Sequence, residues 1–252
     1  MLHFVFSILL LLAVFFNLQD VQAQPITAKS WLITNEDTDT ILDEANADRI
    51  QPIASISKLL TAMVVLDAKQ DLDELVPLST KIKDGLPSQL SRRTLLELAL
   101  VNSNNRAAQT LCEQYPGGFG VCVYVMNQKL YKLNMLDSIV YEPTGLDKRN
   151  TSSARQLMYL VKAAANYPFI VEADKKTSVE VNVKKRKMVY RNTNPLKGKK
   201  DFIISKTGWI NASGGCIVSK INNSIVIVLG SRNTHTRINE VAYLYDIHKR
   251  RL

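Results

Sequence analysis

The chain has 252 residues, of which 46% are hydrophobic and 22% charged, with only ten glycines and eight prolines. This length and hydrophobic content can bury a substantial core, and the composition excludes a disordered chain. The formal net charge of +9 favours an anionic partner. We expect one compact domain without internal repeats.

The N-terminus has the pattern of a secretory signal. Residues 2–16 are almost continuously apolar, and the small residues of Val21–Ala23 predict cleavage before Gln24. The apolar run is shorter than the roughly 20 residues of a membrane-spanning helix. We therefore expect a signal peptide at residues 1–23 and export to the periplasm. The alternative is an uncleaved anchor in the inner membrane, because no Lys or Arg precedes Lys29.

The mature chain, residues 24–252, is strongly basic. Asp20 is the only Asp, Glu, Lys or Arg among residues 1–23, so 32 basic and 22 acidic residues remain, a formal charge of +10. Much of this charge lies at residues 184–187 and 197–200. No stacking aromatic residues accompany these runs, so we interpret them as solvated hairpin faces and expect no nucleic-acid partner.

Three cysteines leave at least one unpaired thiol. Cys112 and Cys122 flank a Tyr-Pro-Gly-Gly loop that a disulfide could close, and the sequence leaves this pairing open. Cys216 lies in an apolar strand pattern and is expected to be a buried thiol. No Cys/His spacing is typical of a metal site, so we expect neither metal nor cofactor.

Elements at both ends of the chain predict a sheet. Trp31–Asn35 and Thr40–Glu44 form a predicted hairpin, and a helix with apolar residues at spacings of three and four follows Pro52. Further helices are predicted at Leu95–Val101, Arg106–Gln114, Phe119–Leu133, Ser153–Asn166 and Arg237–His248, and further strands around Ser178–Asn192, Phe202–Lys206, Gly215–Ile221 and Ser224–Leu229. We expect an α+β fold, with an antiparallel sheet built from both termini, flanking helices and a central helical subdomain at about residues 70–170.

Ser55 and Lys58 form a Ser-x-x-Lys tetrad in the first turn of the helix predicted after Pro52. A spacing of three residues places both on one helical face. A lysine amine that has lost its proton can accept the serine proton and so create a nucleophile, and the helix N-terminus offers N–H groups to an oxyanion. Alone, the tetrad is also consistent with an N-cap serine beside a solvent-facing lysine.

Ser103-Asn104-Asn105 is a Ser-x-Asn triplet between two predicted helices. The Ser103 hydroxyl could relay protons between Lys58 and a leaving group, and the Asn105 amide could hold both a lysine and a substrate carbonyl. A second copy of the pattern, at residues 231–233, follows the last strand and is expected to cap a loop.

Lys206-Thr207-Gly208 ends an apolar strand and precedes Trp209. The lysine and the threonine hydroxyl can receive a carboxylate, and Gly208 allows a ligand backbone to approach closely. The backbone N–H of Trp209 could complete an oxyanion hole with that of Ser55.

The three motifs occur in one order, each in a fitting context of helix start, interhelical loop and strand. From about Trp31 to Leu244 the chain resembles the low-molecular-mass penicillin-binding proteins, the D-alanyl-D-alanine carboxypeptidases and endopeptidases. Asn-Arg-Ala-Ala at 105–108, Tyr-Pro-Gly-Gly at 115–118 and Arg-Asn-Thr-Asn-Pro-Leu at 191–196 resemble the endopeptidase branch. The likeness also includes residues 52–54, 126–129 and 142–146.

The resemblance implies a β-lactamase/transpeptidase-like fold and a serine peptidase that cuts D-alanyl bonds in peptidoglycan peptide stems. Ser55 would be the acyl-ester nucleophile, Lys58 the proton acceptor and Ser103 the third catalytic residue. The implied substrate-binding residues are Asn105, Lys206, Thr207, Gly208 and Trp209. β-Lactams would be covalent inhibitors, and the positive charge of Lys206 is expected to help keep Lys58 neutral. The additional β-domain and C-terminal membrane anchor of many relatives are not expected here.

Hydrolysis of cross-links is the first interpretation, and removal of terminal D-alanine is the second. A serine β-lactamase is a more distant alternative, because the second motif carries Asn104 where such enzymes usually have Asp, and no Glu-x-x-Leu-Asn segment exists. A non-catalytic protein that binds wall polymers through its basic runs is the alternative from another class. A Ser-His-Asp hydrolase is disfavoured, because His235 lies in a polar segment without a nucleophile elbow.

Overall fold

The structure is a computed structural model that describes residues 26–184, 186–196 and 201–251. The predicted signal peptide at residues 1–23, Lys185 and the basic run at 197–200 lie outside the described residues, so the predictions made there stay untested. Within the described ranges, no helix is both long and apolar enough to cross a membrane.

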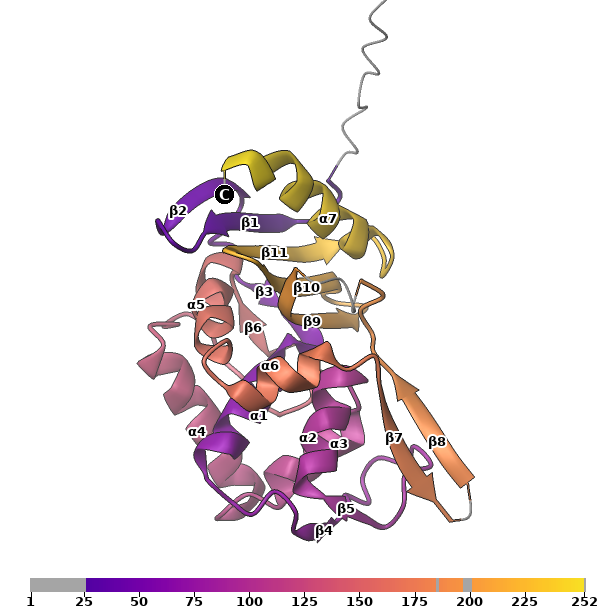
Figure 1. The fold of residues 1–252 in the computed structure, drawn as a ribbon. Helices are drawn as coiled ribbons and strands as arrows, with labels where there is room; N and C mark the ends of the chain where they lie inside the picture. Colours follow the sequence, from indigo (N-terminus) through magenta and orange to yellow (C-terminus); the bar gives the residue numbers. More distant parts are fainter. Residues whose placement is uncertain (1–25, 185, 197–200, 252) are drawn as a thin grey trace, which may run out of the picture.

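A five-stranded antiparallel sheet joins the two ends of the chain, as expected (Figure 1). The strand order is β2-β1-β11-β10-β9, and β1 pairs with β11 in a register that sets Ser30 opposite Leu229. The N-terminal hairpin of β1 and β2 is therefore joined to the rest of the sheet through the last strand. The strands are β1 (Ser30–Asn35), β2 (Thr40–Ala45), β9 (Phe202–Ile210), β10 (Gly214–Ile221) and β11 (Ser224–Ser231).

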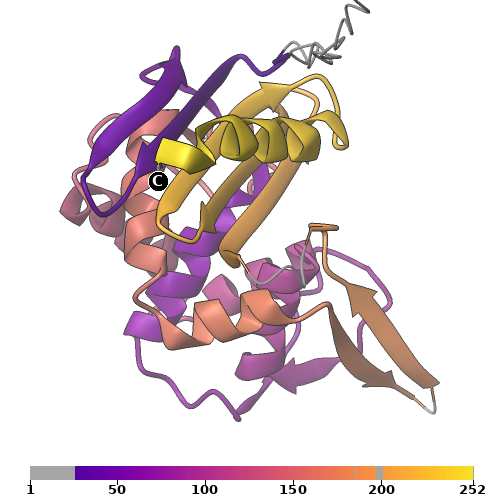
Figure 2. The same cartoon turned by 45° about the horizontal axis from the view of Figure 1, so that its top comes forward.

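Strand β11 is buried along its whole length because both faces of the sheet are covered. Alternate side chains point to opposite faces of a strand. Val226 and Val228 pack in a cluster with Val241 and Leu244 of helix α7 (Thr236–His248), whereas Ile225 and Leu229 belong to the main core, which the remaining helices share. Figure 2 shows α7 lying across the outer face of the sheet.

The helical region lies on the other face of the sheet (Figure 1). Helix α1 (Ser57–Asp67) runs through its centre, and nine of its residues, Ser57 to Val65, are buried. The remaining helices surround α1, as expected for a helix that is apolar on a wide face. They are α2 (Arg92–Val101), α3 (Asn105–Glu113), α4 (Gly118–Lys132), α5 (Ala154–Ala164) and α6 (Pro168–Lys175).

A long hairpin projects from the body of the molecule (Figure 1). Strands β7 (Ser178–Val183) and β8 (Arg186–Arg191) form it, within the strand-like stretch predicted at 178–192. Its base packs through Val179 and Val181, which are buried. Arg186 and Lys187 are exposed, as expected for a solvated hairpin face.

Several short elements were not predicted. They comprise α6, the 3₁₀ turn η2 (Lys249–Arg251), and two small ladders that pair β3 (Gln51–Pro52) with β6 (Thr151–Ser152) and β4 (Leu75–Pro77) with β5 (Gln89–Ser91). Strands of two or three residues are too short to show a periodic pattern. The ladder of β3 and β6 ties the chain just before Ser55 to the segment that follows residue 150.

The disulfide left open by the sequence is present between Cys112 and Cys122. It links α3 to α4 across a separation of ten residues, and both cysteines are fully buried. Cys216 is a free, buried thiol on β10, as predicted.

The predicted position of Ser55 within the helix needs a correction. Residues Ala54–Ile56 form a separate 3₁₀ turn, η1, and the α-helix begins only at Ser57. Ala54 has a φ of +48°, in the left-handed region that side chains with a Cβ rarely adopt. Ser55 therefore lies in a strained turn just before the regular helix. Backbone strain of this kind is common at functional sites.

Gly145 packs directly against this turn. A Cβ atom added to Gly145 would lie 1.9 Å from the carbonyl oxygen of Ala54, and its φ is +78°. Only glycine fits a position with this conformation and this contact. The loop containing Gly145 therefore supports the Ser55 turn from one side.

We predict that Gly145→Ala lowers the free energy of unfolding by about 3 kcal/mol or more, because the added methyl group must displace backbone atoms. Gly85→Ala is the matched control: Gly85 has a φ of +79°, but no atom of the described residues lies within 4 Å of an added Cβ. It should cost only the backbone strain, about 1 kcal/mol. Urea unfolding of both variants measures the difference, and equal losses would contradict the packing argument.

Candidate active site

The three motifs meet in one pocket, although more than 150 residues separate the first from the last. Ser55 lies on η1, Ser103 in the loop between α2 and α3, and Lys206 on the edge strand β9. The pocket has a volume of about 180 Å³ and is lined by Ser55, Ser103, Thr193, Thr207, Gly208, Trp209 and Arg237.

Lys58 is completely buried beneath Ser55. Its Nζ lies 2.9 Å from Ser55 Oγ, 2.8 Å from Asn105 Oδ1 and 2.5 Å from the carbonyl oxygen of Thr144. A neutral amine has two hydrogens and one lone pair. The two carbonyl oxygens can accept both hydrogens, so the lone pair is left for the hydroxyl hydrogen of Ser55.

Burial lowers the pKa of Lys58 from its ordinary value to about 7. Desolvation is the main cause, and the negative charge of Glu142 opposes it. The expected repulsion between the two lysines contributes to the lowered pKa of Lys206, whereas desolvation is the main cause of the lowered pKa of Lys58. A neutral Lys58 close to a serine hydroxyl can act as a general base near pH 7.

Glu142 is engaged by its own loop and not by Lys58. Its carboxylate accepts hydrogen bonds from the backbone N–H groups of Thr144 and Gly145, both at 2.6 Å, and of Asp147 at 3.2 Å. These bonds fix the loop that presents the Thr144 carbonyl to Lys58. Glu142 therefore shapes the surroundings of the amine without forming an ion pair with it.

Ser103 is in direct contact with Lys206. Lys206 Nζ donates a hydrogen bond of 2.8 Å to Ser103 Oγ, and the side chain of Lys206 is 1% exposed. Burial lowers the pKa of Lys206 well below its ordinary value, with further contributions from the positive charges of Lys58 and Arg237. Ser103 has a φ of +60°, so it too is held in the left-handed region.

Asn104, the middle residue of the second motif, stabilises the loop between α2 and α3. Asn104 Oδ1 accepts from the backbone N–H of Ala107 at 2.8 Å and thereby caps α3, while its Nδ2 donates to Asp84. Arg106 also binds Asp84, through Nη1 at 3.3 Å. This cluster fixes the loop on which Ser103 lies.

Strand β9 passes very close to the Ser55 turn. A Cβ on Gly208 would lie 2.9 Å from the backbone nitrogen of Ser55 and 3.0 Å from the Cβ of Ala54. The backbone of residues 207–209 can lie this near to Ser55 only because residue 208 is glycine. Trp209 is 41% exposed at the rim of the pocket.

Sequence reasoning missed two residues of the pocket. Arg237, at the start of α7, donates from Nη1 to the carbonyl oxygen of Gly208 at 2.5 Å, and its buried Nε makes no hydrogen bond with the described residues. The helix pattern at 237–248 gave no sign of this role. Thr193 lies in the segment at residues 191–196 that resembles the endopeptidase branch. That resemblance was the one feature of the sequence that could have pointed to Thr193 as a pocket residue.

The second Ser-x-Asn copy does not reach the pocket. Asn233 Oδ1 accepts from the backbone N–H groups of His235 and Thr236 and so caps the start of α7, as expected.

Comparison with known proteins identifies the family. The sequence profile of the D-alanyl-D-alanine carboxypeptidase family matches residues 17–233. The chain belongs to this family. It is 39% identical to a D-alanyl-D-alanine endopeptidase of Pseudomonas aeruginosa, over 88% of this chain and 77% of the relative, and 36% identical to one of Escherichia coli, over 95% and 86%.

The solved structures confirm the predicted fold class. Penicillin-binding protein D2 of Listeria monocytogenes, in its cefotaxime-bound form, superimposes with a TM-score of 0.80 at 25% identity. The match covers 89% of this chain and 98% of that protein. This D-alanyl-D-alanine carboxypeptidase family member thus has the antiparallel sheet and helical region of a penicillin-binding protein.

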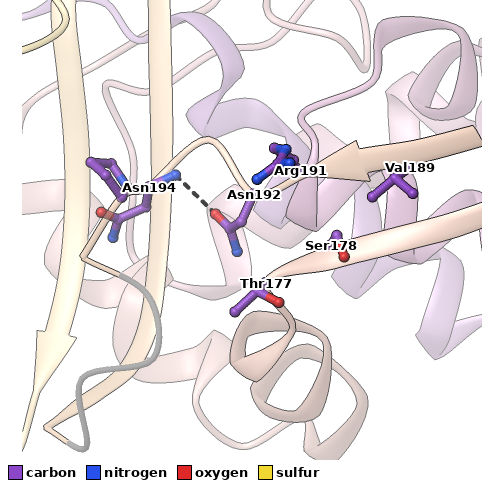
Figure 3. A pocket seen from close by; sticks show the side chains of 7 residues that line it. Thr177, Ser178, Val189, Arg191, Asn192 and Asn194 are labelled. Atoms are coloured by element: carbon purple, nitrogen blue, oxygen red, sulfur yellow. Dashed lines mark hydrogen bonds between the residues drawn. The ribbon is translucent and has the colours of Figure 1, made fainter.

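A larger hollow of about 490 Å³ lies at the base of the β7–β8 hairpin (Figure 3). None of the three-motif residues lines it. The smaller pocket is the one that contains residues of all three motifs, Ser55, Ser103 and Thr207. Among the described residues, no cluster of three His, Cys, Asp or Glu side chains could hold a metal ion.

We predict that Lys58 titrates near pH 7 in the folded enzyme. Asn105→Asp should raise this pKa, because a carboxylate would replace the neutral oxygen 2.8 Å from Nζ. Carbon NMR of lysine-labelled protein measures both values, and Lys58→Gln identifies the signal by removing it. A Lys58 that titrates as an ordinary exposed lysine would contradict the proposed effect of burial.

Proposed function

We propose that this protein is a serine D,D-peptidase that hydrolyses D-alanyl peptide bonds of peptidoglycan through an acyl-enzyme on Ser55. The observation that carries the proposal is the buried Lys58 amine, with its pKa lowered to about 7, at 2.9 Å from Ser55 Oγ. A serine alone is a poor nucleophile, and a neutral amine at this distance supplies the missing base.

In the acylation step, Ser55 Oγ attacks the D-alanyl carbonyl carbon while its proton moves to Lys58 Nζ. The oxyanion is stabilised by the backbone N–H groups of Ser55 and Trp209, an arrangement supported by the close approach of Gly208 to the Ser55 nitrogen. The proton accepted by Lys58 is relayed through the Ser103 hydroxyl to the leaving nitrogen as the carbon–nitrogen bond breaks. Lys58 and Ser103 thus return to their starting protonation states, and the acyl-ester remains on Ser55.

The leaving group carries a carboxylate next to the scissile nitrogen. Thr207 and Arg237 line the side of the pocket formed by β9 and α7, where they offer a hydroxyl and a positive charge, and the buried Lys206 amine lies next to Ser103. Asn105, whose Oδ1 lies 2.8 Å from Lys58 Nζ, is proposed to hold both this amine and the substrate carbonyl. These roles follow from position and chemistry, and each can be tested by substitution.

Water then hydrolyses the acyl-ester and regenerates Ser55. The site lacks the features that favour a serine β-lactamase. Asn104 caps α3 and binds Asp84, and Glu142 accepts hydrogen bonds from backbone N–H groups and from Asn150 Nδ2. A β-lactam should therefore form a long-lived adduct.

Two observations favour cross-links as the substrate over terminal D-alanine. The relatives named endopeptidase, from P. aeruginosa, E. coli and Haemophilus influenzae, are 39%, 36% and 29% identical, whereas those named carboxypeptidase are 26% to 28% identical. In addition, Thr193, which lies in the segment at 191–196 that resembles the endopeptidase branch, lines the pocket. Carboxypeptidase activity is the second candidate, supported by the description of the family.

We further propose that residues 1–23 are a signal peptide and that residues 24–252 form the peptidase domain in the periplasm. The Cys112–Cys122 disulfide supports export, because disulfides persist in oxidising compartments. A peptidoglycan substrate requires the same location.

We predict that a fluorescent penicillin labels the purified protein covalently and that Ser55→Ala abolishes the labelling. Ser88→Ala, at an exposed serine outside the pocket, is the control and should label as the parent does. Denaturing gels measure the adduct. Equal labelling of Ser55→Ala and the parent would disprove the assignment of the nucleophile.

Digestion of purified muropeptides distinguishes the two candidate activities. We predict that the enzyme converts cross-linked dimers to monomers faster than it removes D-alanine from pentapeptide monomers, and that Ser55→Ala does neither. Chromatography coupled to mass measurement follows both products. Loss of terminal D-alanine without cleavage of dimers would favour the carboxypeptidase.

A further inference from the structure

Thr193 lies in the catalytic pocket but belongs to none of the three motifs. It follows strand β8 and lines the pocket together with Ser55, Ser103 and Thr207. Its Oγ1 is 2.6 Å from Oγ1 of Thr207. This contact joins the third motif to the segment that leaves the hairpin.

The backbone around Thr193 is fixed at several points. Its N–H donates to the carbonyl oxygen of Val101 at 3.1 Å, close to the Ser103 loop. Asn194 Nδ2 donates to Ser205 Oγ on β9 at 2.8 Å, and Asn194 N–H donates to Asn192 Oδ1 at 2.9 Å (Figure 3). Thr193 is therefore held between α2 and β9, so its hydroxyl has a defined position relative to Thr207.

The two hydroxyls share a limited number of hydrogens. Each threonine hydroxyl has one hydrogen and two lone pairs. Because one hydrogen is used between the two oxygens, the pair has one hydrogen left for a ligand. Thr207 directly follows Lys206, the residue proposed to bind the leaving-group carboxylate. A hydrogen carried by Thr207 Oγ1 would therefore lie next to that residue, where it can also be donated to the carboxylate.

We propose that Thr193 is a positioning residue, whose hydroxyl donates to Thr207 Oγ1 and thereby directs the Thr207 hydrogen at the carboxylate of the leaving group. This inference rests on the proposed peptidase function. Thr193 acts through Thr207 and makes no bond to the substrate. It gives the enzyme a preference for substrates that carry a carboxylate next to the scissile bond.

The test compares two peptides, one ending in D-Ala-D-Ala with a free carboxylate and the same peptide with a terminal carboxamide. Thr193→Val removes the hydroxyl but keeps the shape of the side chain. We expect it to raise KM for the carboxylate peptide about tenfold, the usual effect of one hydrogen bond to a charged group, with little change in kcat. Cleavage of the carboxamide peptide should not change.

Two further variants separate positioning from a general effect on the fold. Thr193→Ser retains a hydroxyl and should restore the KM of the parent. In a Thr207→Val background, Thr193→Val should cause no additional loss, because its partner is already absent. Thr177→Val, at an exposed threonine at the hairpin base, is the control and should leave both KM values unchanged (Figure 3).

The outcomes are distinct. Equal losses on both peptides, or additive losses in the double variant, would overturn the positioning role. If Thr193→Val proves unstable in thermal unfolding, Thr193→Ala and Thr193→Ser give the same comparison of hydroxyl loss and retention. If penicillin fails to label Ser55 in the parent, the proposed function itself is wrong. If labelling occurs and KM is insensitive to Thr193, only this inference fails.

Discussion

The site depends on a lysine amine buried without a carboxylate partner. A buried ammonium is costly unless it is paired, so it tends to lose its proton. Lys58 is surrounded by neutral acceptors, Asn105 Oδ1 and the Thr144 carbonyl, while the carboxylate of Glu142 is directed into backbone N–H groups. An aspartate in place of Asn105 would restore the charge and remove the base. The helical core and the loop at 142–147 together maintain this neutral environment.

A second constraint is the crowding of three backbones at Ala54 and Ser55. The loop at Gly145 contacts the turn from one side, and Gly208 on β9 lies beside it. The positive φ of Ala54 is tolerated because these contacts hold it in place. Two glycines from distant parts of the sequence therefore determine where the nucleophile lies relative to the strand that binds substrate.

The long elements and the three motifs could be predicted from the sequence because periodicity and residue order carry that information. Strand β11 and helix α1 show clear apolar patterns, and the order of motifs suggested that Ser55, Ser103 and Lys206 would meet. The 3₁₀ turn at Ser55 and the two-residue ladder at β3 could not be predicted, since tertiary contacts create them. The position of Arg237 in the pocket could not be predicted either, because the helix pattern shows only that Arg237 lies in the first turn of α7.

The pairing of β1 with β11 determines when the active site can form during folding. Strand β1 can pair with β2 early, but its second partner exists only when residues 224–231 are present, and Lys206 and Arg237 also come from the last fifth of the sequence. Contacts of such long sequence separation form late in folding. A chain that is still being synthesised therefore carries Ser55 and Lys58 but no complete pocket. The peptidase becomes competent only after its C-terminal region has folded.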